Sequence, residues 1–221
     1  MMVTPTGEEV AHPIGHTTPD GIGECDLVIV LCKAFDTKAT MEEGKELVGP
    51  HTAVMSLQNG LGAEDALSEV VGADHVIGGK TLYWWYVAST WSRSGNYPGK
   101  DTFIGELDGT ITDRVKAVGS AFEEAGMHCI VSDNIMGVIW DKLLVNVATG
   151  AVCGITHLPY GDMYQEDKLV ATAVAAVQEG MDVAAKAGVK LTYSDPMDVL
   201  ELARAGLPYD FKPSILQSLE K

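Results

Sequence analysis

The sequence has 221 residues, of which 46% are hydrophobic and 21% charged, and its formal net charge at pH 7 is −16. This length accommodates one large domain or two small domains with packed cores. The acidic balance argues against partners such as nucleic acid or an anionic membrane, because both require a basic face. No secretory signal and no apolar run of about 18 residues, the length of a membrane-spanning helix, is apparent. We therefore expect a cytoplasmic globular protein whose partners include neither nucleic acid nor a membrane.

The cysteines show no pattern of a metal or redox site. There are four of them, and none forms a CxxC pair or accompanies a cluster of histidines. We therefore expect reduced thiols and no metal.

The first part of the chain alternates apolar and helical segments. Apolar runs at residues 26–32, 53–57 and 75–78 lack polar alternation, which is the pattern of strands buried on both faces. Residues 36–48 and 64–71 between them have helical composition, and glycine follows each of these segments. The alternation predicts a βαβαβ unit with a parallel sheet.

Aromatic residues gather at positions 83–91, where three tryptophans and two tyrosines occur. Such a group can line a pocket, although packing in a core or an interface is its more frequent role. A strand at 102–104, a helix at 112–125 and a strand at 128–131 are expected after it.

Helices are predicted for the rest of the chain. We expect them at residues 133–152, at 164–187, from Ser194 to about residue 206, and from Pro213 onward. We place a boundary near residue 133, with an α/β domain at residues 1–133 and a helical domain at 134–221. The predicted fold class is thus α/β, with a partial Rossmann-type parallel sheet followed by an all-α domain.

Polar residues follow two of the predicted strands. Lys33 comes directly after the first apolar run, and Gln58-Asn59-Gly60 follows the second. In open parallel sheets, ligands bind beyond the carboxyl ends of the strands. A lysine there can bind a phosphate or a carboxylate, and Asn59 offers both a donor and an acceptor. The alternatives are a lysine that extends into solvent and an Asn-Gly pair that only forms a turn.

Lys142 and Asn146 are four residues apart in a predicted apolar helix, so they share one face. Desolvation there would lower the pKa of Lys142 and make it a proton donor near neutrality. The alternative is a lysine lying along the helix with its ammonium in water.

Several segments together resemble ketopantoate reductases. The segments LVIVLCKA, SLQNGLG, FIGELDG and WDKLLVN occur in the order and spacing found in that family, and KPSILQSLEK resembles the start of a later family segment. The resemblance runs from about residue 20 to the end of the chain.

The resemblance implies NADPH-dependent reduction of 2-dehydropantoate (ketopantoate) to pantoate, in pantothenate and coenzyme A biosynthesis. It also implies a homodimer, with an NADP-binding domain at residues 1–133 and a helical substrate and dimerisation domain at 134–221. Lys142 would be the catalytic acid. The substrate would be bound by Asn146, Ser214 and Asn59, and the cofactor by Lys33, Gln58, Asn59 and Gly60.

Three departures from the family pattern stand out. The glycine-rich GxGxxG turn that binds a pyrophosphate is absent. An acidic residue of the family's substrate helix would fall beyond Lys221, and Gly150 stands where many members have asparagine. We therefore expect a chain truncated at both ends. Two alternatives remain, namely a reductase of a different 2-keto acid and a non-catalytic remnant that only dimerises.

Overall fold

The computed structural model describes residues 2–4, 7–9, 12–81, 86–89, 92–94, 101–205 and 207–220. For 2–4, 7–9, 86–89 and 92–94 it describes the backbone only. The chain divides into two compact units, Met1–Ile135 and Met136–Lys221. The predicted aromatic group lies largely outside the described residues, and no role is assigned to it.

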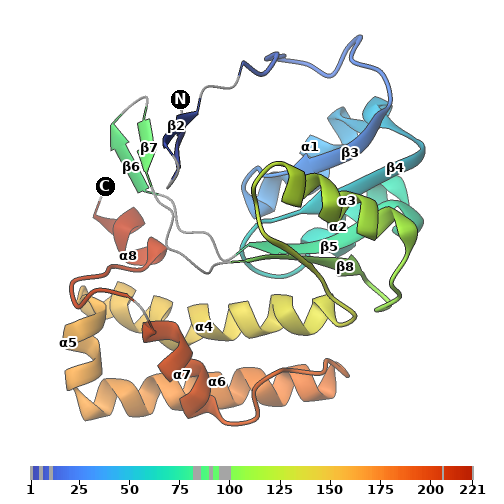
Figure 1. Ribbon diagram of the computed structural model, residues 1–221. Helices are drawn as coiled ribbons and strands as arrows, with labels where there is room; N and C mark the ends of the chain where they lie inside the picture. The colour runs from blue at the N-terminus through green and yellow to red at the C-terminus, as the bar shows by residue number, and fades with distance from the viewer. Residues whose placement is uncertain are drawn as a thin grey trace. The chain divides into compact units, whose positions relative to one another are not determined.

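The first unit is built on a five-stranded sheet with the order β3-β4-β5-β8-β9 (Figure 1). Its strands are β3 (Cys25–Val30), β4 (Val48–Ser56), β5 (Val76–Thr81), β8 (Thr102–Glu106) and β9 (Cys129–Val131). Strands β3, β4 and β5 run parallel, β8 is antiparallel to β5, and β9 is parallel to β8. The helices are α1 (Thr37–Glu43), α2 (Ala63–Val71) and α3 (Asp113–Glu124), and short 3-10 turns lie at Ala34–Asp36, Lys45–Leu47 and Ala73–His75. The predicted α/β fold with a parallel βαβαβ unit is confirmed.

Helices cover both faces of this sheet, which explains why its strands lack polar alternation. On one face, Met55 packs in a cluster with Val115 and Phe122 of α3. On the other face, the neighbouring Val54 packs with Met41 of α1 and with Leu67 of α2. Successive residues of β4 therefore enter different cores, and both positions must be apolar.

Two strands extend further than the sequence pattern indicated. β4 begins at Val48, so it includes both Pro50 and Gly49, the glycine that follows the predicted helix. β5 continues through Lys80 to Thr81, beyond the predicted end at Gly78. A lysine in the strand hides this extension from a search for apolar runs.

A second sheet of the first unit was not expected from the sequence. It has the order β2-β1-β7-β6, and its strands are β1 (Met2–Thr4), β2 (Gly7–Glu9), β6 (Tyr86–Ser89) and β7 (Ser92–Ser94). β1 pairs with β2 antiparallel and with β7 parallel.

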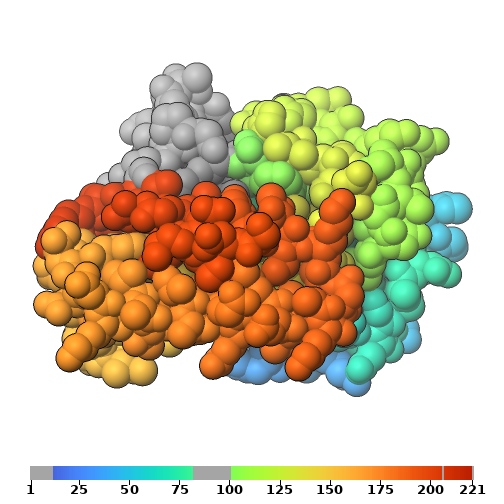
Figure 2. All heavy atoms as spheres, turned by 90° about the horizontal axis from the view of Figure 1, so that it is seen from below, coloured from blue at the N-terminus to red at the C-terminus, as the bar shows by residue number. Residues whose placement is uncertain are grey.

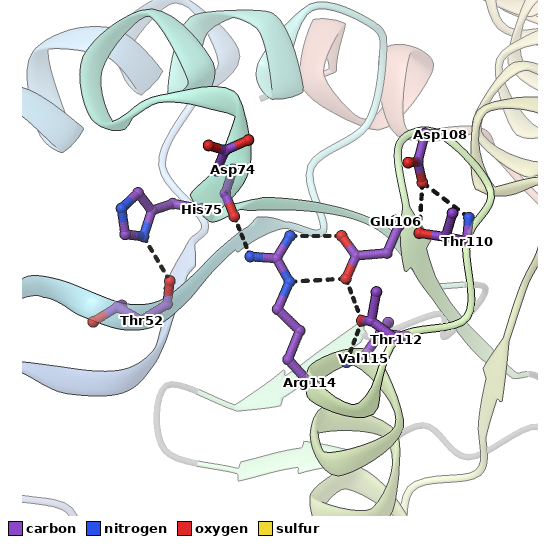
Figure 3. Close-up of polar contacts among 9 residues, drawn as sticks. All are labelled: Thr52, Asp74, His75, Glu106, Asp108, Thr110, Thr112, Arg114 and Val115. Carbon is purple, nitrogen blue, oxygen red and sulfur yellow. Dashed lines mark hydrogen bonds and ion pairs between the residues drawn. The ribbon is translucent and has the colours of Figure 1, made fainter.

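A polar cluster fastens the end of β8 to α3 (Figure 3). Arg114 donates to both carboxylate oxygens of the buried Glu106, over 2.8 and 2.6 Å, and also to the carbonyl of Asp74. The hydroxyl of Thr112 donates to Glu106 over 2.5 Å and caps α3 by accepting from the Val115 N–H. Each polar group of Glu106 that is removed from water thus has a partner.

The second unit consists of helices. They are α4 (Ile135–Thr156), α5 (Tyr160–Gln165), α6 (Asp167–Lys186), α7 (Pro196–Arg204) and α8 (Ser214–Leu219). Helices α6 and α7 contact each other and lie side by side on the face shown in Figure 2. The core of the unit is one cluster that includes Leu144, Ala148, Val177 and Leu200.

Two details differ from the predicted helices. The expected helix at 164–187 is two helices, because Glu166 has extended backbone angles (φ −103°, ψ 99°) and ends α5. Asp195, rather than Ser194, caps α7, since its side chain accepts from the Met197 N–H.

Helix α4 is long and apolar enough to cross a membrane by length and composition, although no such segment was expected from the sequence. Half of its most apolar stretch of 18 residues is buried inside the protein. The buried side chains of Leu144, Ala148 and Val152 belong to the core cluster. A core helix of this kind has the same composition as a membrane span.

Candidate functional site

In the first unit, the candidate residues gather at one edge of the main sheet. The carboxyl ends of β3, β4 and β5 share this edge because the three strands are parallel. Lys33 follows β3, the Gln58–Gly62 turn follows β4, and Lys80 lies near the end of β5. This is the edge at which open α/β sheets bind their ligands.

The side chain of Gln58 joins two of these loops. Its Nε2 donates to the carbonyl of Cys32 over 2.5 Å. Its Oε1 accepts from the hydroxyls of Ser56 at 2.9 Å and Thr37 at 3.0 Å. Cys32 and Thr37 flank Lys33, so Gln58 holds the β3–α1 loop against the β4–α2 turn. A contact between Gln58 and a cofactor stays a prediction.

The turn after Gln58 is open to solvent. Asn59 is exposed, and Gly60 and Gly62 have φ angles of 97° and 90°, which side chains rarely adopt. A side chain added at either glycine would meet no atom within 4 Å. Lys33 on the neighbouring loop is also exposed. An exposed amide, an exposed cation and open space above a glycine turn fit part of an anionic nicotinamide dinucleotide.

Lys80 is a further polar residue at this edge, and the sequence pattern did not predict its role. Its side chain is only 1% exposed, and its Nζ donates to the carbonyl of Gln58 over 2.8 Å. Burial lowers its pKa to about 8, and the nearby Glu64 carboxylate opposes this shift. The signal in the sequence was a lysine directly following an apolar run and a Gly-Gly pair, at the same edge as Lys33.

In the second unit, Lys142 and Asn146 lie four residues apart on α4, and both are half-buried. The preceding Asp141 is buried, and both of its carboxylate oxygens accept from the Thr192 N–H at 3.2 Å. Burial raises the pKa of Asp141, and this hydrogen bond opposes the shift. Asp141 therefore fastens α4 to the loop before α7. Lys142 and Asn146 follow Asp141 on the same helix, one and five residues later.

Helix α8 contacts α4 further along the same helix. A Cβ atom added to the buried Gly150 would lie 2.9 Å from Cδ1 of Ile215, and one added to Gly154 would lie 3.0 Å from its Cγ2. The exposed Ser214 precedes Ile215 at the start of α8. Ser214 thus directly precedes a residue that packs against α4 one and two turns beyond Asn146.

Among the residues that the structure describes, no group of three or more His, Cys, Asp or Glu side chains is arranged to hold a metal ion. The candidate residues form two groups, one in each unit. Lys33, Gln58, Asn59 and Gly60 belong to the first, and Lys142, Asn146 and Ser214 belong to the second.

Comparisons with known proteins agree on one family. Residues 2–108 match the family described as ketopantoate reductase PanE/ApbA, and residues 134–221 match its C-terminal part. A 2-dehydropantoate 2-reductase of Halobacterium salinarum is 32% identical over 208 residues, which cover 92% of this chain and 65% of that protein. A 2-dehydropantoate 2-reductase of Pyrococcus horikoshii is 32% identical over 179 residues, which cover 79% of this chain and 56% of that protein. The chain thus spans less than two thirds of the length of these relatives.

Solved structures show the same fold. The 2-dehydropantoate 2-reductase of Geobacter metallireducens superposes with a TM-score of 0.87 at 26% identity, over 99% of this chain and 73% of that chain. A D-mandelate dehydrogenase in complex with NADH superposes at 0.78 with 21% identity, over 89% of this chain and 66% of that chain. A dimeric ketopantoate reductase from Staphylococcus aureus superposes at 0.75 with 16% identity, over 91% and 66% of the two chains.

Proposed function

This chain belongs to the ketopantoate reductase family, and we propose on that premise that the complete protein reduces 2-dehydropantoate to pantoate with NADPH. This reaction would serve pantothenate and coenzyme A biosynthesis. The observation that carries the proposal is the pair Lys142 and Asn146, half-buried on one face of a mostly apolar helix. A proton donor and a hydrogen-bonding amide in that setting suit the reduction of a polar ketone.

Lys142 is the proposed catalytic acid. As the ketone carbon accepts a hydride, negative charge develops on its oxygen, and the ammonium of Lys142 stabilises that charge and donates a proton. Asn146 hydrogen-bonds the substrate from the next helical turn. The hydroxyl of Ser214, at the start of α8, binds the carboxylate region of the 2-keto acid.

The first unit is proposed to bind the cofactor, whose nicotinamide supplies the hydride when it is bound. Asn59 contacts cofactor and substrate, Lys33 contributes a positive charge, and Gly60 leaves room above the turn. The neighbour solved with NADH supports a nicotinamide cofactor. The choice of NADPH follows the resemblance to the family.

The domain roles and the assembly are part of the same proposal. Residues 1–133 would bind NADP, and residues 134–221 would bind the substrate and form a homodimer in the cytoplasm. The structural likeness to a dimeric ketopantoate reductase supports the dimer.

A different 2-keto acid is the second candidate substrate, and the contact between Gly150 and Ile215 favours it. From Val147 to Gly154, the polar side chains of α4 are those of Thr149 and Cys153, and both are buried. The Thr149 hydroxyl is already used by Tyr160 at 2.7 Å. A substrate group near Ile215 thus meets an apolar surface, which suits a hydrocarbon side chain better than a hydroxyl.

The test is turnover by the protein expressed from its complete gene. NADPH oxidation is followed with 2-dehydropantoate, with 2-keto acids that carry hydrocarbon side chains, and with NADH in place of NADPH. Preference for 2-dehydropantoate with NADPH is the expected result. Preference for a hydrocarbon 2-keto acid would select the second candidate. Absence of both turnover and NADPH binding would refute the reductase proposal and favour a non-catalytic remnant.

A further inference from the structure

A lysine is buried beneath the turn that carries Asn59. Lys80 lies near the carboxyl end of β5, in the middle of the main sheet, and its side chain is 1% exposed. A buried ammonium is costly unless polar groups surround it, so its position calls for a specific partner. That partner is the carbonyl oxygen of Gln58, at 2.8 Å from Nζ.

This hydrogen bond acts on the peptide group that joins Gln58 to Asn59. The peptide group is planar, so fixing its carbonyl oxygen also fixes the orientation of the Asn59 N–H. The next residue, Gly60, has a φ angle of 97°, and a Cβ atom added to it would meet no atom within 4 Å. Gln58 therefore restrains the start of the turn, because its side chain bonds to the neighbouring loop and its carbonyl bonds to Lys80.

We propose that Lys80 is a positioning residue that holds the Gln58–Gly60 turn in the conformation that binds the nicotinamide cofactor. The inference rests on the proposed function, because that function gives Asn59 its contact with the cofactor. Lys80 acts through the backbone of Gln58 and does not itself touch the ligand. It extends the site by one residue from β5, the strand that contributed none of the predicted site residues.

The carboxylate of Glu64 favours the charged form of Lys80. Glu64 lies in the first turn of α2, is 6% exposed, and is the charged group that acts on Lys80 among the side chains the structure describes. Burial lowers the pKa of Lys80 to about 8, while the carboxylate of Glu64 raises it. Lys80 therefore loses its charge as the pH rises through about 8, and its hydrogen bond to Gln58 weakens.

Substitution of Lys80 by methionine tests the inference, because methionine retains most of the volume and removes the ammonium that donates to Gln58. The substitution is made alone and together with Glu64→Gln, because the buried Glu64 carboxylate would otherwise lose its cation. In this chain without cofactor, we expect the NMR order parameters of the Asn59 and Gly60 amides to fall from about 0.85 to below about 0.6, because the Gln58 carbonyl loses its hydrogen bond. In the complete protein, NADPH affinity should fall about tenfold, as for the loss of one charge-assisted hydrogen bond. Lys38→Met is the matched control, because Lys38 pairs with Glu69 on the surface. It should leave both measurements unchanged.

The pH dependence separates positioning from a merely structural role. NADPH affinity of the complete protein should weaken as the pH rises through about 8. Glu64→Gln should move this midpoint to lower pH, because it removes the carboxylate that favours the ammonium, and Lys80→Met should abolish the step.

Two results would overturn the inference. The first is unchanged order parameters of the Asn59 and Gly60 amides in the folded Lys80→Met variant, and the second is a midpoint that Glu64→Gln does not move. Failure of the unmodified complete protein to bind NADPH is a different outcome, since it would refute the proposed function and remove the cofactor role of Lys80 with it.

Discussion

Arg114 and Glu106 form a two-pronged ion pair in which Nε donates to Oε1 over 2.8 Å and Nη2 donates to Oε2 over 2.6 Å. The Glu106 side chain is 7% exposed, whereas that of Arg114 is 34% exposed. The pair connects the end of β8 to the first turn of α3, and through the carbonyl of Asp74 it also reaches the turn before β5. It is therefore a structural element of the sheet and not part of the proposed site.

Replacing Arg114 with alanine should destabilise the protein, because the Glu106 carboxylate would stay buried without its cation. We expect a loss of about 2 kcal/mol in the free energy of unfolding, less than for a fully buried pair because a third of Arg114 is exposed. Urea denaturation measures it. Lys116→Ala on the same helix removes an exposed pair with Asp113 and should change stability by no more than about 0.5 kcal/mol. Equal effects of the two substitutions would contradict the assignment.

Glu106 should also make stability depend on pH. Its hydrogen bond with Arg114 lowers its pKa in the folded state, while burial opposes the shift. The ion pair therefore contributes fully above the unfolded pKa of about 4.3, and this contribution is lost as the pH falls through the lower, folded pKa. Urea titrations from pH 7 downward should show less acid destabilisation for Glu106→Gln than for the unmodified protein. An equal acid slope for Glu106→Gln and for the unmodified protein would contradict this assignment.

Lys142→Ala should lower the turnover rate of the complete enzyme by about 10²- to 10⁴-fold, the range for loss of a general acid. NADPH affinity should stay nearly unchanged, because the proposed proton donor acts mainly in the transition state. Steady-state kinetics and cofactor fluorescence measure the two quantities. Lys186→Ala, at an exposed position near the end of α6, is the matched control. Full activity of Lys142→Ala would exclude Lys142 from the mechanism.

Ile215→Asn tests whether the apolar contact above Gly150 selects the substrate. An amide at this position can hydrogen-bond a substrate hydroxyl, so the ratio of kcat/KM for 2-dehydropantoate to that for a hydrocarbon 2-keto acid should rise about tenfold. Leu219→Asn makes a similar change one helical turn further along α8, where a Cβ on Gly154 would lie 3.6 Å from Cδ1 of Leu219. An identical shift for both variants would indicate a general effect on α8.

Local patterns in the sequence were sufficient to predict the central part of the fold. The apolar runs around Val54 and Ile77 identified β4 and β5, because burial on both faces leaves a continuous apolar run. The pairing of Met2–Thr4 with Ser92–Ser94 was not predictable, because these short segments are far apart in the sequence and only the folded chain brings them together. The break at Glu166 was missed because neither glycine nor proline marks it in the sequence.

The sequence also predicted part of the candidate site, namely the residues that directly follow predicted strands. Lys33 and Asn59 follow recognisable strands, and the structure brings their loops together through Gln58. Lys80 was missed because a lysine inside a strand reads as the end of an apolar run, whereas the fold buries it and gives it the Gln58 carbonyl as a partner. Hydrogen bonds to a backbone carbonyl leave no trace in the residue pattern.

The side-chain amide of Gln58 makes three hydrogen bonds that stiffen this edge of the sheet. Since one side chain bonds to the residue before Lys33, to the start of α1 and to the end of β4, the two loops at this edge form a single stiff body. A ligand that binds one of these loops needs no rearrangement of the other loop. Little conformational entropy of the protein is therefore lost on binding. Thr37, which touches no proposed ligand, should for the same reason influence how firmly Asn59 is held.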